Sequence, residues 1–232
     1  MPYSRAFRLF GGLLLMLAFA LAYTAPSRAD EAAAKPKRVI HGNPQDRRAV
    51  EALLEESVGD AEVTVGKTIS SLNGKFKLDK NKPVEDAALD FIDRHRNAFG
   101  LKNAKREFKL IRRDEHEEGD VNLRFNQSFN GVPIWGKELI VHIDKTKDLD
   151  LIISENVPTP DIDTTPLITA EEALSTVRAD LKIPSDNTFW KHEKELVIYN
   201  DILAYRVNIM GGEFFVNAKN GSIIRKDFIA PS

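Results

Sequence analysis

A nine-residue alternation at Val121–Phe129 is the sequence feature that most restricts the fold. A period of two places every second side chain on the same face of a strand, whereas a helix would spread these side chains around its axis. The stretch therefore predicts a strand with one buried face and one solvated face, as is typical of antiparallel sheets. Val121, Leu123, Phe125, Gln127 and Phe129 alternate with Asn122, Arg124, Asn126 and Ser128.

The residues around this strand predict a helix followed by an antiparallel meander. Asn130-Gly131 favours a tight turn, after which residues 134–143 return as a strand with Leu139, Val141 and Ile143 on one face. Apolar residues at helical spacing predict helices over 46–58 and 84–100, each ended by a glycine. Further strands are expected at 61–65, 69–72, 75–78, 108–113 and 149–153, with a turn at Asn73-Gly74.

The same pattern begins again after a proline-containing segment. Residues 155–166 include Pro158, Pro160 and Pro166, which indicates a linker, and Thr169 with Glu172 forms a capping box for a helix. Strands are expected at 194–199, 202–209, 214–218 and 223–226, the last two joined by Asn220-Gly221. The fold class is therefore α+β, with two helix-on-antiparallel-sheet modules, cystatin-like in outline. The modules are expected at 46–156 and 169–232, and the linker at 157–168.

The first 29 residues read as a signal peptide. Arg5 and Arg8 precede an apolar run over 9–22, and Ser27-Arg28-Ala29 is a small-x-small cleavage site. The run is shorter than the roughly 20 residues that cross a bilayer. Residues 30–45 are polar and are expected to be a flexible lead-in. We expect an exported protein, periplasmic or extracellular, with no membrane attachment after the signal is cleaved.

Composition excludes several functions. The chain has no cysteine, which rules out thiolate zinc sites, iron–sulfur clusters and cysteine nucleophiles. The formal net charge is −2, and it becomes −5 once the three arginines of the leader are removed. A chain with this balance offers no electrostatic reason to bind nucleic acid.

The histidines do not form a catalytic or metal-binding pattern. His116-Glu117 and His192-Glu193 each begin like the helix of a zinc peptidase, but Asp120 and Leu196 occupy the position that needs a second histidine. No Gly-x-Ser-x-Gly elbow, phosphate loop or dinucleotide fingerprint is present. We therefore expect a protein that is not an enzyme and that needs no cofactor or metal.

Calcium is the metal that this argument excludes least firmly. Asp161, Asp163 and Thr165 carry oxygen ligands at alternate positions, but the segment lacks the spacing of an EF-hand loop. A linker is the preferred interpretation.

Residues 123–145 resemble the motif of the fungalysin/thermolysin propeptide domain. That motif has an arginine, a glutamine and an aromatic residue, then Gly-x-Pro-x-x-Gly before an apolar strand. The matching residues are Arg124, Gln127, Phe129, Gly131, Pro133 and Gly136. Residues 168–181 and 196–225 resemble a PepSY domain, so the resemblance extends over about 46–226.

The residues of this motif also have a structural interpretation. Gly131 and Pro133 are expected to build the hairpin connection, and Gly136 to allow a bulge or a close backbone approach. Arg124 and Gln127 differ in phase, so they should face opposite sides of their strand. We expect the motif to be mainly structural.

The resemblance implies a function in protein binding. In the family's zymogens a peptidase with a His-Glu-x-x-His helix follows the PepSY domain, whereas this sequence stops at Ser232. The chain then acts in trans as a folding assistant, an inhibitor, or both, of a thermolysin-like metallopeptidase. The alternative is an exported protein-binding module with the same fold and an unrelated partner.

The C-terminal tail is the candidate inhibitory segment. Phe228 or Ile229 would enter the apolar pocket that such peptidases present after the scissile bond, and the carboxylate of Ser232 would approach the zinc as a product does. The alternative is a frayed end, or a last strand that packs Phe228 on its own domain.

Overall fold

The chain divides into two units at Lys35, and the fold below is that of the second, Pro36–Ser232. The computed structural model describes residues 35–184 and 189–227. It contains helices and a mostly antiparallel mixed sheet, which confirms the predicted α+β class. The elements in chain order are β1 (Arg38–Gly42), α1 (Arg47–Glu55), β2 (Ser57–Val65), β3 (Ile69–Lys77), α2 (Val84–Arg94), α3 (Ala104–Glu107), β4 (Phe108–Glu115), β5 (Val121–Phe129), β6 (Val132–Ile143), β7 (Asp148–Ser154), α4 (Ala170–Asp180), β8 (His192–Tyr199), β9 (Ile202–Ile209), β10 (Gly212–Asn217) and β11 (Ile223–Asp227).

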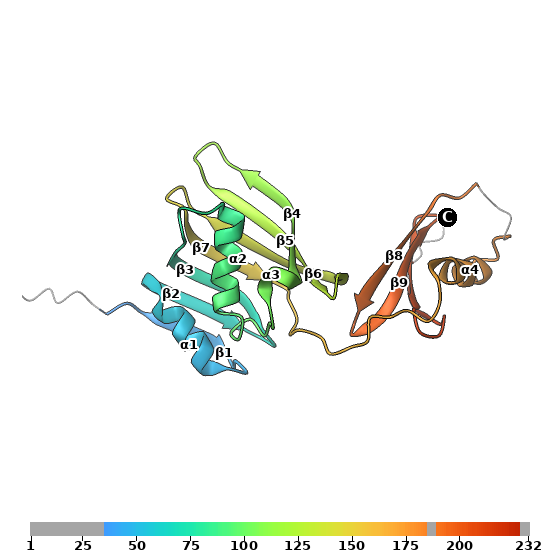
Figure 1. Cartoon of the computed structure of the whole chain (residues 1–232), viewed down its shortest axis with the longest axis horizontal. Helices are drawn as coiled ribbons and strands as arrows, with labels where there is room; N and C mark the ends of the chain where they lie inside the picture. The colour runs from blue at the N-terminus through green and yellow to red at the C-terminus, as the bar shows by residue number, and fades with distance from the viewer. Residues whose placement is uncertain (1–34, 185–188, 228–232) are drawn as a thin grey trace, which may run out of the picture. The chain divides into compact units, whose positions relative to one another are not determined.

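The first seven strands form one sheet in the order β1-β2-β3-β7-β6-β5-β4. Neighbouring strands are antiparallel except β1 and β2, which run parallel. Helices α1 and α2 lie across one face of this sheet (Figure 1). Phe76, Phe91, Phe99 and Phe125 are fully buried in the core that they enclose.

Local chemistry explains where the two helices begin and which of their faces is buried. The Asp46 side chain caps α1 by accepting a hydrogen bond from Ala49 N, and Pro83 immediately precedes α2, where a missing N–H is harmless. The residues of α1 that recur at helical spacing, Val50, Leu53 and Leu54, are buried, as are Phe91 and Ile92 of α2. Both helices end earlier than predicted, at Glu55 and Arg94.

Two regions differ from the sequence-based expectation. Asn73-Gly74 does not turn the chain, because β3 runs through it and pairs with β2 on one side and β7 on the other. Gly74 has φ +143°, and a Cβ there would lie 2.6 Å from the Cβ of Ala61, so the glycine serves close strand packing. Within the expected flexible lead-in, Arg38–Gly42 forms β1 on the edge of the sheet. Hydrogen bonds to β2 hold this segment as a strand, in spite of the polar composition that suggested flexibility.

The last four strands form an antiparallel run in the order β8-β9-β10-β11. The predicted capping box of α4 is confirmed, because the Thr169 and Glu172 side chains each bond the other residue's backbone. Helix α4 contributes Leu174 and Val177 to a second core that also holds Val207 and Val216. A single parallel bridge, Ile134 to Ile198, links β6 to β8.

Candidate functional site

The Gln127 side chain is buried on the helix-covered side of β5 and binds the chain that leaves β7. Its amide donates to Val157 O at 2.9 Å, and its carbonyl oxygen accepts from Val157 N at 3.0 Å. One carboxamide therefore satisfies both backbone groups of Val157, as a neighbouring strand would. The motif glutamine fixes the middle of the segment that we call the strap, residues 155–159.

A buried carboxylate holds the far end of the strap. Glu107 Oε1 and Oε2 accept from the Thr159 hydroxyl at 2.8 and 2.9 Å, and Oε1 also accepts from Lys102 N and Asn103 N. Asn156, which immediately precedes Val157, donates from its side-chain amide to Phe99 O at 2.9 Å, and its backbone carbonyl accepts from the Thr68 hydroxyl. The first part of the predicted linker is thus tied to the first core by hydrogen bonds.

Arg124 faces the other side of β5, which confirms the predicted opposite orientation of the two motif residues. Its Nη1 lies 2.5 Å from Glu138 Oε2 on the neighbouring strand β6. This ion pair is partly exposed, because each side chain keeps contact with solvent. A partly exposed cross-strand ion pair of this kind contributes little to stability.

The remaining motif residues shape the connection from β5 to β6. Asn130 and Gly131 both have positive φ, 50° and 82°, as a tight hairpin turn requires. Asn126 pairs with Glu138 whereas Ser128 pairs with Pro133, so β6 bulges between these two pairs. Gly136 lies in that bulge with φ 68°. The expected bulge is confirmed, and the alternative of a close backbone approach is wrong, because a Cβ at Gly136 would meet no atom within 4 Å. Phe129 packs against the second core.

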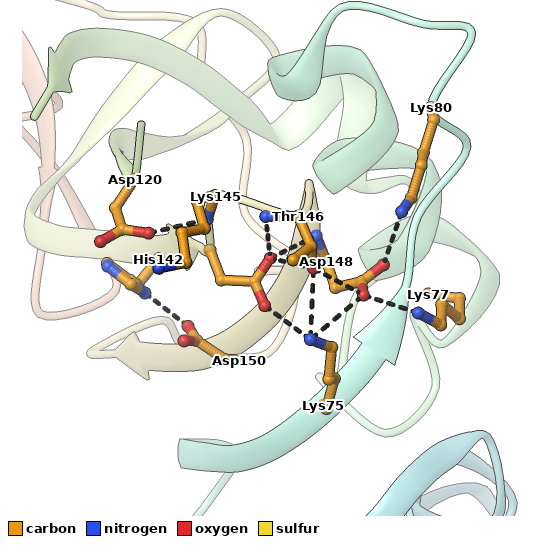
Figure 2. A network of polar contacts seen from close by, with 10 residues as sticks. Lys75, Lys77, Lys80, Asp120, His142, Lys145, Thr146, Asp148 and Asp150 are labelled. Atoms are coloured by element: carbon orange, nitrogen blue, oxygen red, sulfur yellow. Dashed lines mark hydrogen bonds and ion pairs between the residues drawn. The ribbon is translucent and has the colours of Figure 1, made fainter. Parts of the chain in front are cut away.

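The hairpin that joins β6 to β7 is pinned to β3 by a lysine cluster around one buried carboxylate (Figure 2). The Asp148 side chain is fully buried, with Lys77 Nζ at 2.7 Å, Lys75 Nζ at 3.4 Å and Lys80 Nζ at 3.8 Å. Burial raises the pKa of Asp148, but hydrogen bonds from Lys77, Thr146 and Lys75 outweigh it and lower the pKa below its ordinary value. The pKa of Asp144 on the same hairpin is lowered in the same way.

Two histidines of the first module have distinct surroundings. His142 on β6 and Arg124 on β5 lie on the same face of the sheet. The Nδ1 atom of His142 is 2.5 Å from Asp150 Oδ1. His95 is buried against Phe91, and its Nε2 lies 3.3 Å from Glu56 Oε2. Burial lowers the pKa of His95, although Glu56 opposes the shift.

The described residues include no group of three or more histidines, aspartates and glutamates that could hold a metal ion. Asp163, one of the three residues whose oxygens could bind calcium, accepts from Lys219 Nζ at 2.5 Å and Thr165 N at 2.9 Å. The Lys219 hydrogen bond is the main cause that lowers the pKa of Asp163 to about 2. The tail residues Phe228, Ile229 and Ser232 lie outside the described residues, so their inhibitory role stays a prediction.

The face of the first sheet opposite α1 and α2 carries aliphatic residues that were not predicted to be functional from the sequence. We call it the open face. Ile140 and Ile153 are cross-strand partners on it, and Leu151 pairs with His142 beside them. The signal in the sequence was Ile140 itself, an apolar residue out of phase with the buried Leu139, Val141 and Ile143.

The central strands of the first sheet match a motif known from another protein family. Residues 106–154 match the Fungalysin/Thermolysin Propeptide Motif. The matched segment covers β4, β5, β6 and β7, and it includes Glu107, Gln127 and the hairpin of Figure 2. The segment that matches this motif therefore supplies four of the seven strands behind the open face, and Gln127 and Glu107, which hold the strap.

Curated relatives extend the similarity beyond the motif. Thermolysins of Alicyclobacillus acidocaldarius subsp. acidocaldarius and Bacillus caldolyticus are each 28% identical over 182 residues, which covers 69% of this chain and 32% of theirs. Bacillolysin of Brevibacillus brevis is 23% identical over 164 residues, 61% of this chain and 31% of its own. The chain spans about a third of the length of these relatives. In the described residues, no helix is long and apolar enough to cross a membrane.

Proposed function

We propose that this chain is an exported, non-catalytic propeptide-type protein that acts in trans on a thermolysin-like metallopeptidase, as a folding assistant, an inhibitor or both. The match of residues 106–154 to the propeptide motif carries the proposal, because these residues form four complete strands of one sheet. The similarity to proteins named as thermolysins supports the choice of partner.

The proposal assigns a part to each segment. Residues 1–29 direct export, and residues 46–156 form the propeptide-like module with the strap at its exit. Residues 169–232 form a PepSY-like module, and each module is cystatin-like in outline. A partner that is not covalently attached does not have the high effective concentration of a zymogen's propeptide, so the surface of this chain must supply the affinity.

A refolding and inhibition assay tests the proposal. A thermolysin-family peptidase without its own propeptide is denatured and refolded with and without the purified protein, and recovered activity is measured. The same protein is titrated into the folded peptidase. We expect a higher yield of active enzyme, a lower initial rate, or both, with saturation at one equivalent.

An unrelated exported protein of similar size and charge serves as the control. The proposal is overturned if the protein neither binds a panel of thermolysin-family peptidases nor changes their refolding or activity. In that case an exported binding module with an unrelated partner, the alternative from the sequence, becomes the better description.

A further inference from the structure

The open face carries an apolar centre, in which Ile140 and Leu151 are half-buried and Ile153 is exposed. Ile140, Leu151 and Ile153 lie on adjacent strands β6 and β7, and the Ile153 side chain is 46% exposed. Outer positions of an antiparallel sheet are normally polar, because that face meets water. Three neighbouring aliphatic residues there indicate a surface that becomes buried when a partner binds.

The surroundings of this centre resemble the rim of a protein interface. Arg124, the cross-strand partner of Ile140, forms an ion pair with Glu138. His142, the cross-strand partner of Leu151, lies beside Asp150. Uncharged polar side chains occupy other neighbouring positions on β3 and β5. The centre itself is aliphatic, its immediate neighbours are polar, and an ion-paired arginine is among them, as at the rim of a protein interface. Neither nucleic acid nor an anionic lipid surface is favoured by such a face. The uncharged neighbours are Ser71, Asn73, Asn122 and Asn126.

The sheet is also large enough for a stable complex. Seven strands at about 4.8 Å spacing and seven residues at about 3.4 Å rise give a face of roughly 34 by 24 Å. This area is comparable to the roughly 800 Å² that each partner contributes to a standard interface. The aliphatic centre would occupy the middle of it, where binding energy is usually concentrated.

We propose that the open face is the docking surface for the folded peptidase, with Ile140, Leu151 and Ile153 packed against an apolar patch of that enzyme. The inference rests on the proposed function. The peptidase is preferred over a second copy of this chain because the residues of the centre all belong to the matched propeptide motif. The proteins similar to this chain are named as thermolysins and have about two thirds of their length outside the similarity.

Lysine substitutions test the centre. Ile140→Lys and Ile153→Lys place a charge where the partner would desolvate it, and we expect each to weaken binding to the peptidase about tenfold or more. Leu167→Lys is the matched control, because Leu167 is 73% exposed in the segment before α4, outside the first sheet. Its binding should stay within about twofold of the unmodified protein. Thermal unfolding of every variant verifies that the fold is retained.

Thiol accessibility provides a second measurement that does not depend on disruptive substitutions. The chain has no cysteine, so Asn73→Cys introduces a single thiol on the open face and Ser175→Cys a single thiol on exposed α4. We expect saturating peptidase to slow maleimide labelling of the Asn73→Cys variant severalfold and to leave the Ser175→Cys variant unchanged.

The outcomes separate this inference from the proposed function. If the unmodified protein binds the peptidase and both lysine variants bind equally well, with labelling of Asn73→Cys unaffected, the docking surface is elsewhere and only this inference fails. If no peptidase binds at all, the proposed function fails and the inference with it. If labelling of Asn73→Cys slows as the protein's own concentration rises without peptidase, the face binds a second copy and the inference is overturned.

Discussion

At the scale of single residues, the Gln127 carboxamide does for the strap what a neighbouring strand does inside the sheet. Replacing Gln127 by alanine removes a fully buried side chain and leaves the part-buried N–H and C=O of Val157 without these partners. We expect the free energy of unfolding to fall by roughly 2–4 kcal/mol, as urea denaturation will measure. Asn126→Ala, on the other face of the same strand, should change it by less than about 0.5 kcal/mol. Equal effects of the two substitutions would contradict the role assigned to Gln127.

His95 gives the first module a dependence on pH. Because burial lowers the pKa of the folded-state imidazole below 6.5, the unfolded chain takes up a proton that the folded chain excludes. Stability from this residue is therefore complete above pH 6.5 and declines as the pH falls below it. We expect His95→Gln to lose less stability than the unmodified protein between pH 7 and pH 5.5, measured by urea midpoints. Parallel pH profiles of the two proteins would show that His95 is not responsible.

At the scale of elements, the lysine cluster of Figure 2 decides how firmly the β6–β7 hairpin is held against β3. Asp148→Asn removes the charge that three lysines share, and we expect a loss of about 2 kcal/mol. The loss stays below that of a fully buried ion pair, because the lysines can turn to solvent. Asp120→Asn in the connection between β4 and β5, where the side chain accepts only from Lys145 N among the described contacts, should cost less than about 1 kcal/mol.

In this cluster the folded state favours the charged form of the titrating groups, whereas at His95 it favours the neutral form. The pKa values of Asp144 and Asp148 are lowered from 3.8, so their contribution is complete above that value and is lost as the pH falls through the lower folded-state pKa. The difference in stability between the unmodified protein and Asp148→Asn should therefore persist at pH 5 and shrink below about pH 3. A difference that grows on acidification would contradict this assignment.

At the scale of the whole molecule, we expect stability to be independent of metal ions. Asp163, one of the three candidate calcium ligands, already accepts hydrogen bonds from Lys219 and Thr165 N. Dialysis against EDTA should leave the melting temperature of the isolated protein unchanged, and added calcium should not raise it. A shift of several degrees with either treatment would indicate a site that this arrangement does not explain.

Elements with a local cause were predictable from the sequence alone. The alternation of Val121–Phe129 predicted a strand with Gln127 and Arg124 on opposite sides, because successive side chains of a strand point to opposite faces. The Thr169–Glu172 capping box and the Asn130-Gly131 turn followed from side chains and backbone angles that act within a few residues. The helix-then-meander order, and with it the α+β class, came from the same local periods.

Only the tertiary structure decided the features that depend on distant partners. Asn73-Gly74 stays extended because β2 and β7 lie on its two sides, and β1 forms because β2 offers an edge. Glu107 and Thr159 are 52 residues apart, so no local pattern reveals that they hold the strap. The open face likewise exists only once β3, β7, β6 and β5 are side by side. Sequence periodicity indicates which side of a strand is buried, whereas strand order decides which side chains become neighbours.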